Sequence, residues 1–404
     1  MSFFVAVVGL GFLIFVHEGG HFVAARLVGL KPRKFYVGFP PPLVRTTRNG
    51  IEYGIGAIPL GGFVKIPGMH RPAPSDVDVH FAPAVAEAPE LAGSVQRLRR
   101  AFADDDLPAA RTALDELGAR RDGVVLSPQA ARGAGRGLTE LGDAVGPDAY
   151  WRASTWKRIV AIAAGPGANI LLALVLFSAL FMTGAGKATT TVDSVVAGKP
   201  AARVGLEHGD RILRVNGQAV AADAIADRIN ASKGRPLVFA VERDGRTLAI
   251  GPVHAQRDQG RYRVGFILRG EGLGPAAAAW QSLRVTGLVT KDIGGSLARL
   301  VSGSGRKDIS SPVGIVEGSS TAAKEGTTNY LWVLGLISLS LALLNLLPLL
   351  PLDGGHIAFS LIEGARGRSV SRAVYERVSA VGIVFVVLLF VIGLSNDIGR
   401  IGGG

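Results

Sequence analysis

Long runs of residues without a charged side chain recur along this chain. Residues 3–16 carry no charge, and neither do residues 159–186, 326–352 and 378–396. A helix needs about 20 apolar residues to cross a hydrocarbon core of about 30 Å, so each run can span a bilayer, the first only if it extends past residue 16. The start of the chain has no basic n-region, so we expect a span there and not a cleaved signal peptide. The pattern predicts a polytopic α-helical membrane protein with four transmembrane helices.

Two of the segments between these runs have strand-like patterns. Residues 49–68 combine glycines with β-branched and aromatic residues, and an Asn-Gly dipeptide and Gly61-Gly62 are turn signals. We expect a membrane-associated β-hairpin, which either presents a strand edge to an unfolded substrate or only packs on the helices. Residues 187–272 contain short strands between turn glycines, which predicts one inserted β-rich domain.

Helical patterns occupy the other connections. Residues 71–150 form an insert in which apolar spacing predicts three short amphipathic helices, beginning near Leu91, Leu107 and Leu138. Residues 127–137 are predicted to be a flexible loop. A further amphipathic helix is expected over 275–304, along the membrane or against the third span. We expect four isolated histidines to be solvated, namely His70, His80, His208 and His254.

The second span contains residues that a plain apolar helix would not need. Gly165, Pro166 and Gly167 are expected to interrupt its helix, and their small size allows a neighbouring helix to approach closely. Asn169 is a polar group at membrane depth and should bond a neighbour, with a substrate role as an alternative.

Composition and charge refine this picture. The chain has 404 residues, of which 48% are hydrophobic, its mean hydropathy is +0.33 and its formal net charge is +12. This charge could indicate nucleic-acid binding, but the basic residues near the spans gather in two connections. By the positive-inside rule, residues 27–158 and 353–377 are cytoplasmic, and both termini and the β-rich domain are extracytoplasmic. We therefore expect no nucleic-acid partner. The chain has no cysteine, which excludes disulfides and thiolate metal ligands.

The first apolar run continues into His17-Glu18-Gly19-Gly20-His21. Residues four apart lie on one face of a helix, so both imidazoles can bind one metal ion. Glu18 follows the first histidine and can reach a water on that metal, which is the zincin pattern H-E-x-x-H. The alternative is a chance pentapeptide on a buried helix. Ionisable groups inside a span usually mark a functional site, so we predict His17 and His21 as zinc ligands and Glu18 as the general base.

A two-histidine site needs a third ligand and an open position. The third span ends in NLLPLLPLDGGHI, where two prolines break the helix and Asp353 falls on the side that His21 reaches. A carboxylate commonly completes such a site, so Asp353 is the preferred third ligand. His356 is the competitor, and an ordinary Asp-Gly turn is the other interpretation of Asp353.

With these residues, the chain closely resembles the site-2 protease family of intramembrane zinc metalloproteases, in its bacterial form with a single PDZ domain. The family's H-E-x-x-H corresponds to His17, Glu18 and His21, and its N-L-L-P-x-x-x-L-D-G-G string to Asn345 through Gly355. IPLGGFVKIPGM resembles its membrane re-entrant β-loop, AGPGAN the start of its second helix, and GLEHGDRILRVNG its PDZ signature. The insert is the one departure from this resemblance, because the family members that the chain most resembles are expected to have only a brief connector there.

The resemblance implies a set of roles. Zinc would be held by His17, His21 and Asp353, Glu18 would act as the base, and Asn345 would contact substrate, with Gly61 and Gly62 in the substrate-binding loop. The implied activity is hydrolysis of peptide bonds within transmembrane segments, on substrates such as anti-sigma factors or signal-peptide remnants already cut by another protease. The implied location is the bacterial inner membrane, with the active site toward the cytoplasm.

The predicted organisation follows the chain. It comprises a first transmembrane helix with the HEGGH motif (1–28), the β-loop (49–68), the cytoplasmic helical insert (71–150), the second transmembrane helix (157–184), the PDZ domain (187–272), the amphipathic helix (275–304), the third transmembrane helix with the LDG motif (328–352) and the fourth (376–396).

Two rival functions are compatible with parts of the sequence. A metal-ion transporter would not need a glutamate after the first histidine, and a catalytically silent PDZ scaffold would be expected to lose Glu18 or Asp353.

Overall fold

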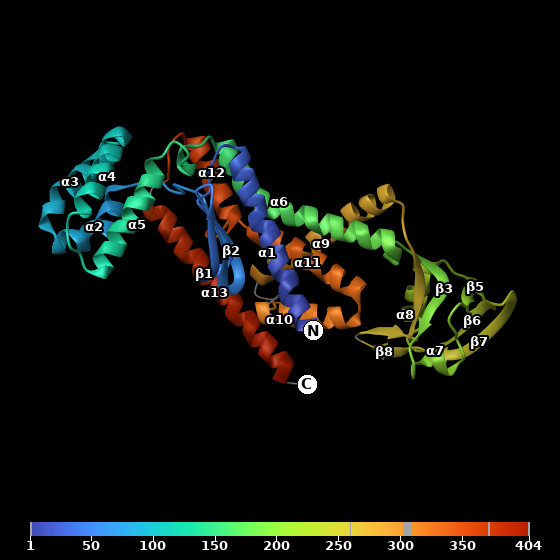
Figure 1. Cartoon of the computed structure of the whole chain (residues 1–404). Coiled ribbons are helices and arrows are strands. Elements are labelled where there is room, and N and C mark those ends of the chain that lie inside the picture. The colour runs from blue at the N-terminus through green and yellow to red at the C-terminus, as the bar shows by residue number, and fades with distance from the viewer. Residues whose placement is uncertain (1, 259, 302–308, 371, 403–404) are drawn as a thin grey trace. The chain divides into compact units, whose positions relative to one another are not determined.

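The computed structural model describes residues 2–258, 260–301, 309–370 and 372–402 (Figure 1). The chain divides into two compact units, one formed by Met1–Ala173 with Val289–Gly404 and the other by Leu174–Leu288. Among the described residues, four helices are long and apolar enough to cross a membrane: α1 (Ser2–Leu27), α6 (Thr155–Leu180), α11 (Thr327–Asn345) and α13 (Arg372–Gly402). These helices agree with the four apolar runs in the sequence.

The two faces of α1 differ in burial. Its buried residues recur at intervals of three or four, which places them along one side of the helix; they include Ala6, Gly9, Leu13, His17, His21 and Ala24. Large apolar side chains lie exposed on its other side, among them Phe4, Val8, Phe12 and Phe15. Exposed apolar side chains of this kind suit contact with lipid. The histidines therefore point into the protein.

An antiparallel hairpin follows α1, and its strands are β1 (Lys34–Arg48) and β2 (Ile51–Lys65). The first half of β1 runs between the two halves of β2, so that Phe35 pairs with both Tyr53 and Val64. The second half of β2 pairs on one side only among the described residues, which makes it a strand edge. The turn predicted at Gly61-Gly62 is wrong, because both glycines lie within β2. A Cβ at Gly61 would come within 2.4 Å of the Phe39 ring, so a glycine at this position lets the ring of Phe39 pack against β2.

The insert is a helical bundle with its own apolar core, formed by α2 (Pro74–Glu87), α3 (Ala92–Ala103), α4 (Leu107–Arg121) and α5 (Pro128–Val145). The flexible loop predicted over 127–137 is wrong, since α5 covers it. Ser127 caps α5 by accepting a hydrogen bond from the backbone N–H of Ala130 at 3.3 Å. A Cβ at Gly137 would come within 2.6 Å of His80, so the glycines of this stretch permit helix packing rather than a loop.

Helix α2 was not among the three helices predicted for the insert. It contains Pro83, and prolines in its sequence obscure the helical pattern. His80 lies on this helix and is half-buried, with Nε2 3.4 Å from a carboxylate oxygen of Glu140. The expectation of a solvated loop histidine is therefore wrong for His80.

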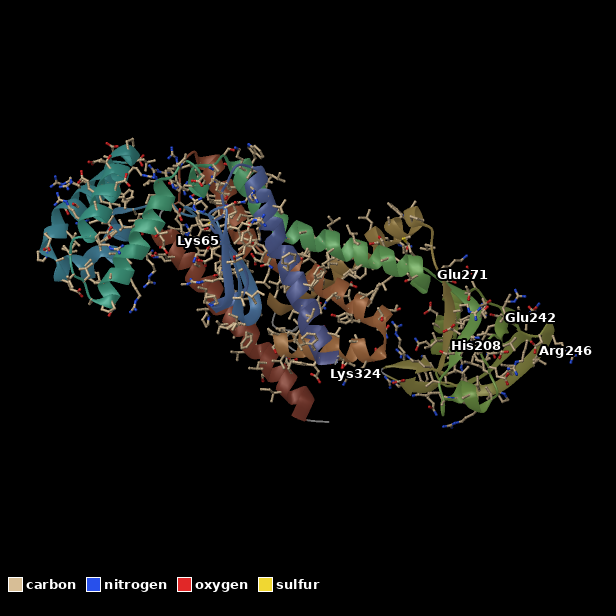
Figure 2. All side chains as sticks on the ribbon, viewed as in Figure 1. Lys65, His208, Glu242, Arg246, Glu271 and Lys324 are labelled. Carbon is tan, nitrogen blue, oxygen red and sulfur yellow. The ribbon has the colours of Figure 1, made fainter. Side chains whose placement is uncertain are left out.

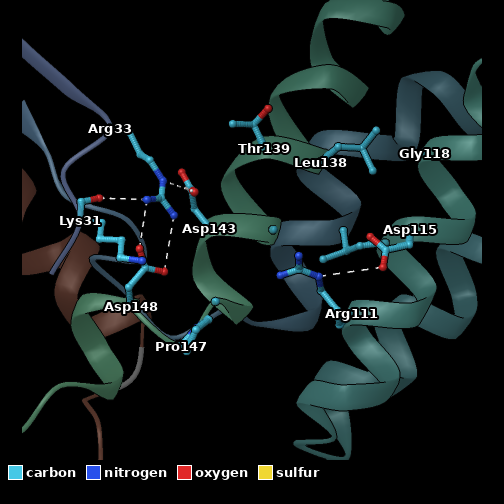
Figure 3. A pocket seen from close by; sticks show the side chains of 13 residues that line it. Lys31, Arg33, Arg111, Asp115, Gly118, Leu138, Thr139, Asp143, Pro147 and Asp148 are labelled. Atoms are coloured by element: carbon cyan, nitrogen blue, oxygen red, sulfur yellow. Dashed lines mark hydrogen bonds and ion pairs between the residues drawn. The ribbon is translucent and has the colours of Figure 1, made fainter. Parts of the chain in front are cut away.

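Arg33 attaches the insert to the hairpin. Its backbone N–H donates to the carbonyl of Lys65 at 2.7 Å, at the base of β2. Its guanidinium donates from Nε to Asp143, in the last turn of α5, at 2.9 Å and lies 3.0 Å from Asp148, just after that helix (Figure 3). These residues line a groove of about 690 Å³ together with residues of α4. Arg33 thus joins the base of the hairpin, through its backbone, to the end of the bundle, through its side chain.

The interruption predicted for the second span is wrong, because α6 continues through Pro166. Proline removes one backbone hydrogen bond, but spanning helices tolerate it where neighbouring helices pack around the site. The two glycines that flank Pro166 are likewise helical. Three further helices belong wholly or partly to the first unit: α9 (Pro275–Val301), α10 (Pro312–Glu325) and α12 (Asp353–Arg366). The sequence pattern does not predict α10.

The second unit is β-rich, as the sequence predicts. Its main sheet has the order β10-β3-β4-β6-β7, with β5 paired to β4, and the strands are β3 (Lys187–Val195), β4 (Arg211–Val215), β5 (Gln218–Ala219), β6 (Pro236–Arg243), β7 (Arg246–His254) and β10 (Phe266–Glu271). A small hairpin and two helices complete it: β8 (Gln256–Asp258), β9 (Arg261–Arg263), α7 (Pro200–Arg203) and α8 (Ala222–Ala231). Its own apolar core includes Ile212 and Phe239. His208 and His254 are exposed, and Figure 2 labels His208 on this unit.

An ion pair between a buried aspartate and a partly exposed arginine links the residue before β4 to the end of β6. The carboxylate of Asp210 has no exposed surface and accepts two hydrogen bonds from Arg243 of β6, at 2.6 and 2.7 Å. It also accepts the backbone N–H of Glu207 at 2.9 Å. Burial acts to raise the pKa of Asp210, but these hydrogen bonds and the positive charge of Arg243 outweigh it and hold the pKa below its ordinary value.

Candidate metal centre

Three side chains from two distant parts of the chain converge on one point. Nε2 of His17 lies 3.3 Å from Nε2 of His21, both on α1. Oδ2 of Asp353, the first residue of α12, lies 3.2 Å from the first nitrogen and 3.3 Å from the second. Within the described part of the chain, this is the group of histidine and acidic residues whose ligand atoms gather closely enough to hold a metal ion.

The spacing of these atoms suits zinc. Ligands placed tetrahedrally about 2.0 Å from zinc lie about 3.3 Å from one another, which is the separation seen for all three pairs. Oδ2 of Asp353 is buried and makes no well-oriented hydrogen bond to any described residue, as expected for an atom that serves a metal. Two imidazoles and one carboxylate leave one tetrahedral position open, which is typical of catalytic zinc sites.

Helix α6 supports both imidazoles. Ala161, Gly165 and Asn169 recur every four residues, so they share the face of α6 that lies against α1. The carbonyl of Ala161 accepts a hydrogen bond from Nδ1 of His21 at 3.0 Å, which directs Nε2 toward the centre. A Cβ at Gly165 would lie 2.2 Å from Nε2 of His21, so only glycine leaves room for the ring.

The carboxylate is positioned by the turn between α11 and α12. Helix α11 ends at Asn345, and prolines occupy the turn before Asp353. A Cβ at Gly354 would come within 2.2 Å of the carbonyl oxygen of Leu346, and one at Gly355 within 2.5 Å of the backbone N of Leu350. The two glycines therefore let the start of α12 press against the preceding turn, which fixes where Asp353 points.

Glu18 lies beside the three converging atoms and under the hairpin. It is buried, with 8% of its surface exposed, and its charge interacts with those of His21 and Asp353. A Cβ at Gly62 would lie 2.8 Å from Cγ of Glu18, so the edge half of β2 runs directly over this carboxylate. An acid next to both a metal site and an open strand edge is well placed to meet an extended peptide.

Two other candidate residues, Asn345 and His356, lie outside the cluster. The carboxamide of Asn345 donates to the carbonyl of Leu341 in its own helix at 3.0 Å. Nδ1 of His356 is hydrogen-bonded to the hydroxyl of Tyr375 at 2.5 Å, and His356 belongs to no metal-holding group of described residues. Burial lowers the pKa of His356 to about 4, which keeps its ring neutral at physiological pH.

Sequence reasoning missed the contribution of α6 to the site. The predictions that Gly165 permits close packing and that Asn169 bonds a neighbour are confirmed, but the sequence did not indicate that each contact is with a histidine of α1. The recurrence of small or polar residues at every fourth position, starting from Ala161, is the signal that could have revealed this face. The role of a backbone carbonyl such as that of Ala161 leaves no trace in residue identity.

Comparison with known proteins agrees with this geometry. The sequence profile of peptidase family M50 matches residues 5–389. The chain belongs to peptidase family M50. The resemblance to site-2 proteases is thereby confirmed, and the membership makes the chain an enzyme of the peptidase class and a multi-pass membrane protein.

Full-length relatives of this M50 peptidase carry matching names. The zinc metalloprotease RasP of Geobacillus kaustophilus is 29% identical, over 97% of this chain and 96% of its own length. The regulator of sigma-W protease RasP of Bacillus subtilis is also 29% identical, over 98% of this chain and 97% of its own length. The likeness thus extends through the β-rich unit as well as the metal centre.

Proposed function

We propose that this zinc metalloprotease cleaves peptide bonds within the transmembrane segments of membrane proteins. The observation that carries the proposal is the convergence of His17, His21 and Asp353 inside the helical unit, with Glu18 between that point and an open strand edge. A protease whose metal centre lies within spanning helices is suited to substrates that reach it through the membrane.

The proposed ligands are His17, His21 and Asp353, each through the atom that faces the other two. When bound, zinc polarises the peptide carbonyl and makes water acidic enough to lose a proton near pH 7. Glu18 is the proposed base: its carboxylate takes the proton from the attacking water and passes it to the leaving peptide nitrogen. Its buried position beside Gly62 keeps this proton transfer away from bulk solvent.

The proposed substrate site is the edge half of β2. A transmembrane helix hides its peptide bonds in internal hydrogen bonds, so it must unwind locally before attack. The edge that contains Gly61 and Gly62 offers backbone groups with which an unwound segment can pair as an added strand. Because Gly62 has no side chain, the added substrate strand can lie directly over Glu18. Asn345 remains a proposed substrate contact at the end of α11.

Orientation and substrates complete the proposal. Both termini and the β-rich unit are proposed to be extracytoplasmic, in the inner membrane of a bacterium, with the metal centre toward the cytoplasm. The β-rich unit is the proposed PDZ domain, and it filters bulky ectodomains or binds a newly formed C-terminus. The name of the Bacillus relative as a regulator of sigma-W protease supports anti-sigma factors as substrates, with signal-peptide remnants as the other class.

Two rival functions make different demands on the same residues. A metal-ion transporter has no use for a buried glutamate under a strand edge, and a silent PDZ scaffold has no use for three ligand atoms about 3.3 Å apart. Both rivals tolerate the loss of Glu18, whereas the protease does not.

The decisive experiment compares wild-type and Glu18→Gln proteins, purified in detergent, for zinc content and for cleavage of a model transmembrane substrate. The variant should bind a full equivalent of zinc and lose cleavage by about 10²-fold or more, because the proton acceptor is gone while the ligands remain. Glu18→Ala serves as a second variant that also lacks the acceptor. Cleavage at the wild-type rate by either variant would refute the protease mechanism.

A further inference from the structure

Asn169 of α6 contacts one of the two histidines of the metal centre. It is fully buried, and its carboxamide nitrogen lies 3.3 Å from Nδ1 of His17. Its backbone carbonyl accepts a hydrogen bond from the hydroxyl of Ser338 on α11 at 2.9 Å. The backbone at Asn169 is thus tied to α11, while its side chain is directed to His17. A carboxamide inside a spanning helix is unfavourable unless it serves a polar partner.

The protonation of His17 decides which end of the carboxamide must face it. Nε2 of His17 faces Asp353 and His21, so a metal ligand at this position binds through Nε2. A neutral imidazole that binds metal through Nε2 carries its proton on Nδ1, and this N–H needs an acceptor. A carboxamide NH₂ cannot accept. The two ends of the amide have nearly the same shape, so a half-turn places Oδ1 against Nδ1.

The unpartnered oxygen of Asn169 agrees with this reversal. Oδ1 is buried and has no hydrogen-bond partner among the described residues. The contact with His17 therefore determines how the carboxamide of Asn169 is oriented. Rotating the carboxamide by half a turn replaces the contact between two donors, its NH₂ and Nδ1–H of His17, with an N–H···O hydrogen bond.

We propose that Asn169 is a positioning residue for His17: its Oδ1 accepts Nδ1–H, which holds the ring and its tautomer ready to bind metal. This inference rests on the proposed role of His17 as a ligand. The two histidines should respond differently to substitution of Asn169. The acceptor for Nδ1–H of His21 is the backbone carbonyl of Ala161, which a side-chain substitution does not remove. Loss of the Asn169 side chain should therefore release one ligand and leave the other in place.

The test measures metal affinity rather than turnover. Asn169→Leu keeps the size of the side chain and removes the acceptor, Asn169→Asp keeps an acceptor, and Ser338→Ala removes the bond to the backbone of Asn169 without touching its carboxamide. All are made in the full-length Glu18→Gln protein, so that no self-cleavage intervenes. Zinc affinity is determined by chelator competition, after unfolding midpoints of the metal-free proteins show that each variant is folded.

Asn169→Leu should weaken zinc binding by about 10- to 100-fold, as expected for loss of a hydrogen bond that orients a ligand. Asn169→Asp should recover most of the affinity, and Ser338→Ala should stay within about threefold of the parent. A purely structural role predicts the opposite order, since a buried carboxylate perturbs packing more than leucine does. Unchanged affinity in Asn169→Leu, or no recovery in a folded Asn169→Asp, would overturn the proposal.

A second readout does not depend on the aspartate variant. In ¹⁵N-histidine-labelled, zinc-loaded protein, Nδ1 of His17 should carry a proton whose signal moves in Asn169→Leu, while that of His21 should not move. Equal changes at both histidines would contradict a role specific to His17. Failure of the proposed function is separate: a parent protein that binds no zinc would refute the metalloprotease itself, whereas normal zinc binding by Asn169→Leu refutes only the role of Asn169.

Discussion

Gly165 of α6 lies directly against the imidazole of His21, so that a Cβ added to Gly165 would come within 2.2 Å of the ring nitrogen Nε2. Nothing at that distance can be accommodated without moving the ring or separating the two helices. We predict that Gly165→Ala lowers zinc affinity and reduces cleavage by about 10²-fold, because a shift of about 1 Å in a reacting group has an effect of this size. Zinc analysis and cleavage of a model transmembrane substrate measure both.

Gly167 provides the matched control, two residues along the same helix. A Cβ there would meet no atom within 4 Å. Gly167→Ala should therefore retain zinc and activity within about twofold, and alanine should favour the helix slightly. Equal loss in both variants would mean that α6 is sensitive to any substitution in this stretch and not to the contact with His21.

The second prediction distinguishes Asp353 from His356. Asp353→Ala should reduce both zinc content and activity, because its carboxylate oxygen lies 3.2 and 3.3 Å from the two histidines of α1. His356→Ala should retain zinc, since the ring of His356 is hydrogen-bonded to Tyr375 instead. Zinc is measured after dialysis against a weak chelator. Retention by Asp353→Ala together with loss by His356→Ala would reverse the assignment of the third ligand.

The sequence was informative where chemistry forces residue identity. Two histidines four apart with an adjacent glutamate fix a metal site and a base on a helix, and a single acidic residue at the end of the third apolar run limits the choice of a third ligand. The four spans followed from apolar length alone. These features depend on local spacing or on the solvent around the chain, and both can be read without a structure.

Features that depend on close packing between distant segments could not be predicted from the sequence. Gly61-Gly62 has the composition of a turn, yet both residues lie in β2, where small size admits Phe39 and Glu18. The stretch 127–137 has the composition of a loop, yet its glycines lie in a helix that packs on His80. A glycine has the same identity in a turn and at a close helix contact, and only the neighbour distinguishes them.

The third prediction concerns the attachment of the insert to the hairpin. Arg33→Ala removes the hydrogen bond to Asp143 and the ion pair with Asp148, and should loosen the end of α5 by roughly 1–2 kcal/mol. Hydrogen exchange of residues 141–152 in the full chain should increase accordingly. Arg111→Ala is the control, because Arg111 lines the same groove but its partner Asp115 is exposed and 3.9 Å away on its own helix (Figure 3). Faster exchange in the control than in Arg33→Ala would contradict the attachment.

The fourth prediction separates the β-rich unit from catalysis. All the proposed ligands and the proposed base belong to the other unit, so replacing residues 187–272 by a short linker should leave zinc bound. A substrate already trimmed to a short outer stub should still be cut, and an untrimmed substrate should be cut faster if the unit acts as a size filter. Product bands from both substrates are compared after zinc binding is verified. Loss of cutting on the trimmed substrate, with zinc retained, would instead assign the unit a part in delivering substrate.

The last prediction uses the ion pair between the buried Asp210 and Arg243 to give the β-rich unit a defined pH dependence. The pKa of Asp210 is lower in the folded unit than in the unfolded chain, where it is about 3.9. A depressed pKa means that the folded state holds fewer protons, so this stabilisation is fully present above about pH 4 and is lost as the pH falls through the lower folded value. Asp210→Asn should therefore destabilise the unit by about 2 kcal/mol at pH 7, because it removes the buried charged partner of Arg243 and leaves only the ion pair with the exposed Glu207.

The difference between wild type and variant should shrink as the acid is titrated, since protonation of Asp210 makes the wild-type side chain neutral as well. Hydrogen exchange of the β4 and β6 amides in the full chain, corrected for the intrinsic pH dependence of exchange, measures both effects between pH 7 and pH 3. Arg211→Ala is a suitable comparison, because Arg211 pairs with Glu242 on the exposed surface of the same strands and should contribute less than about 1 kcal/mol. A wild-type-to-variant difference that stayed constant down to pH 3 would mean that the carboxylate of Asp210 is not the source of the stabilisation.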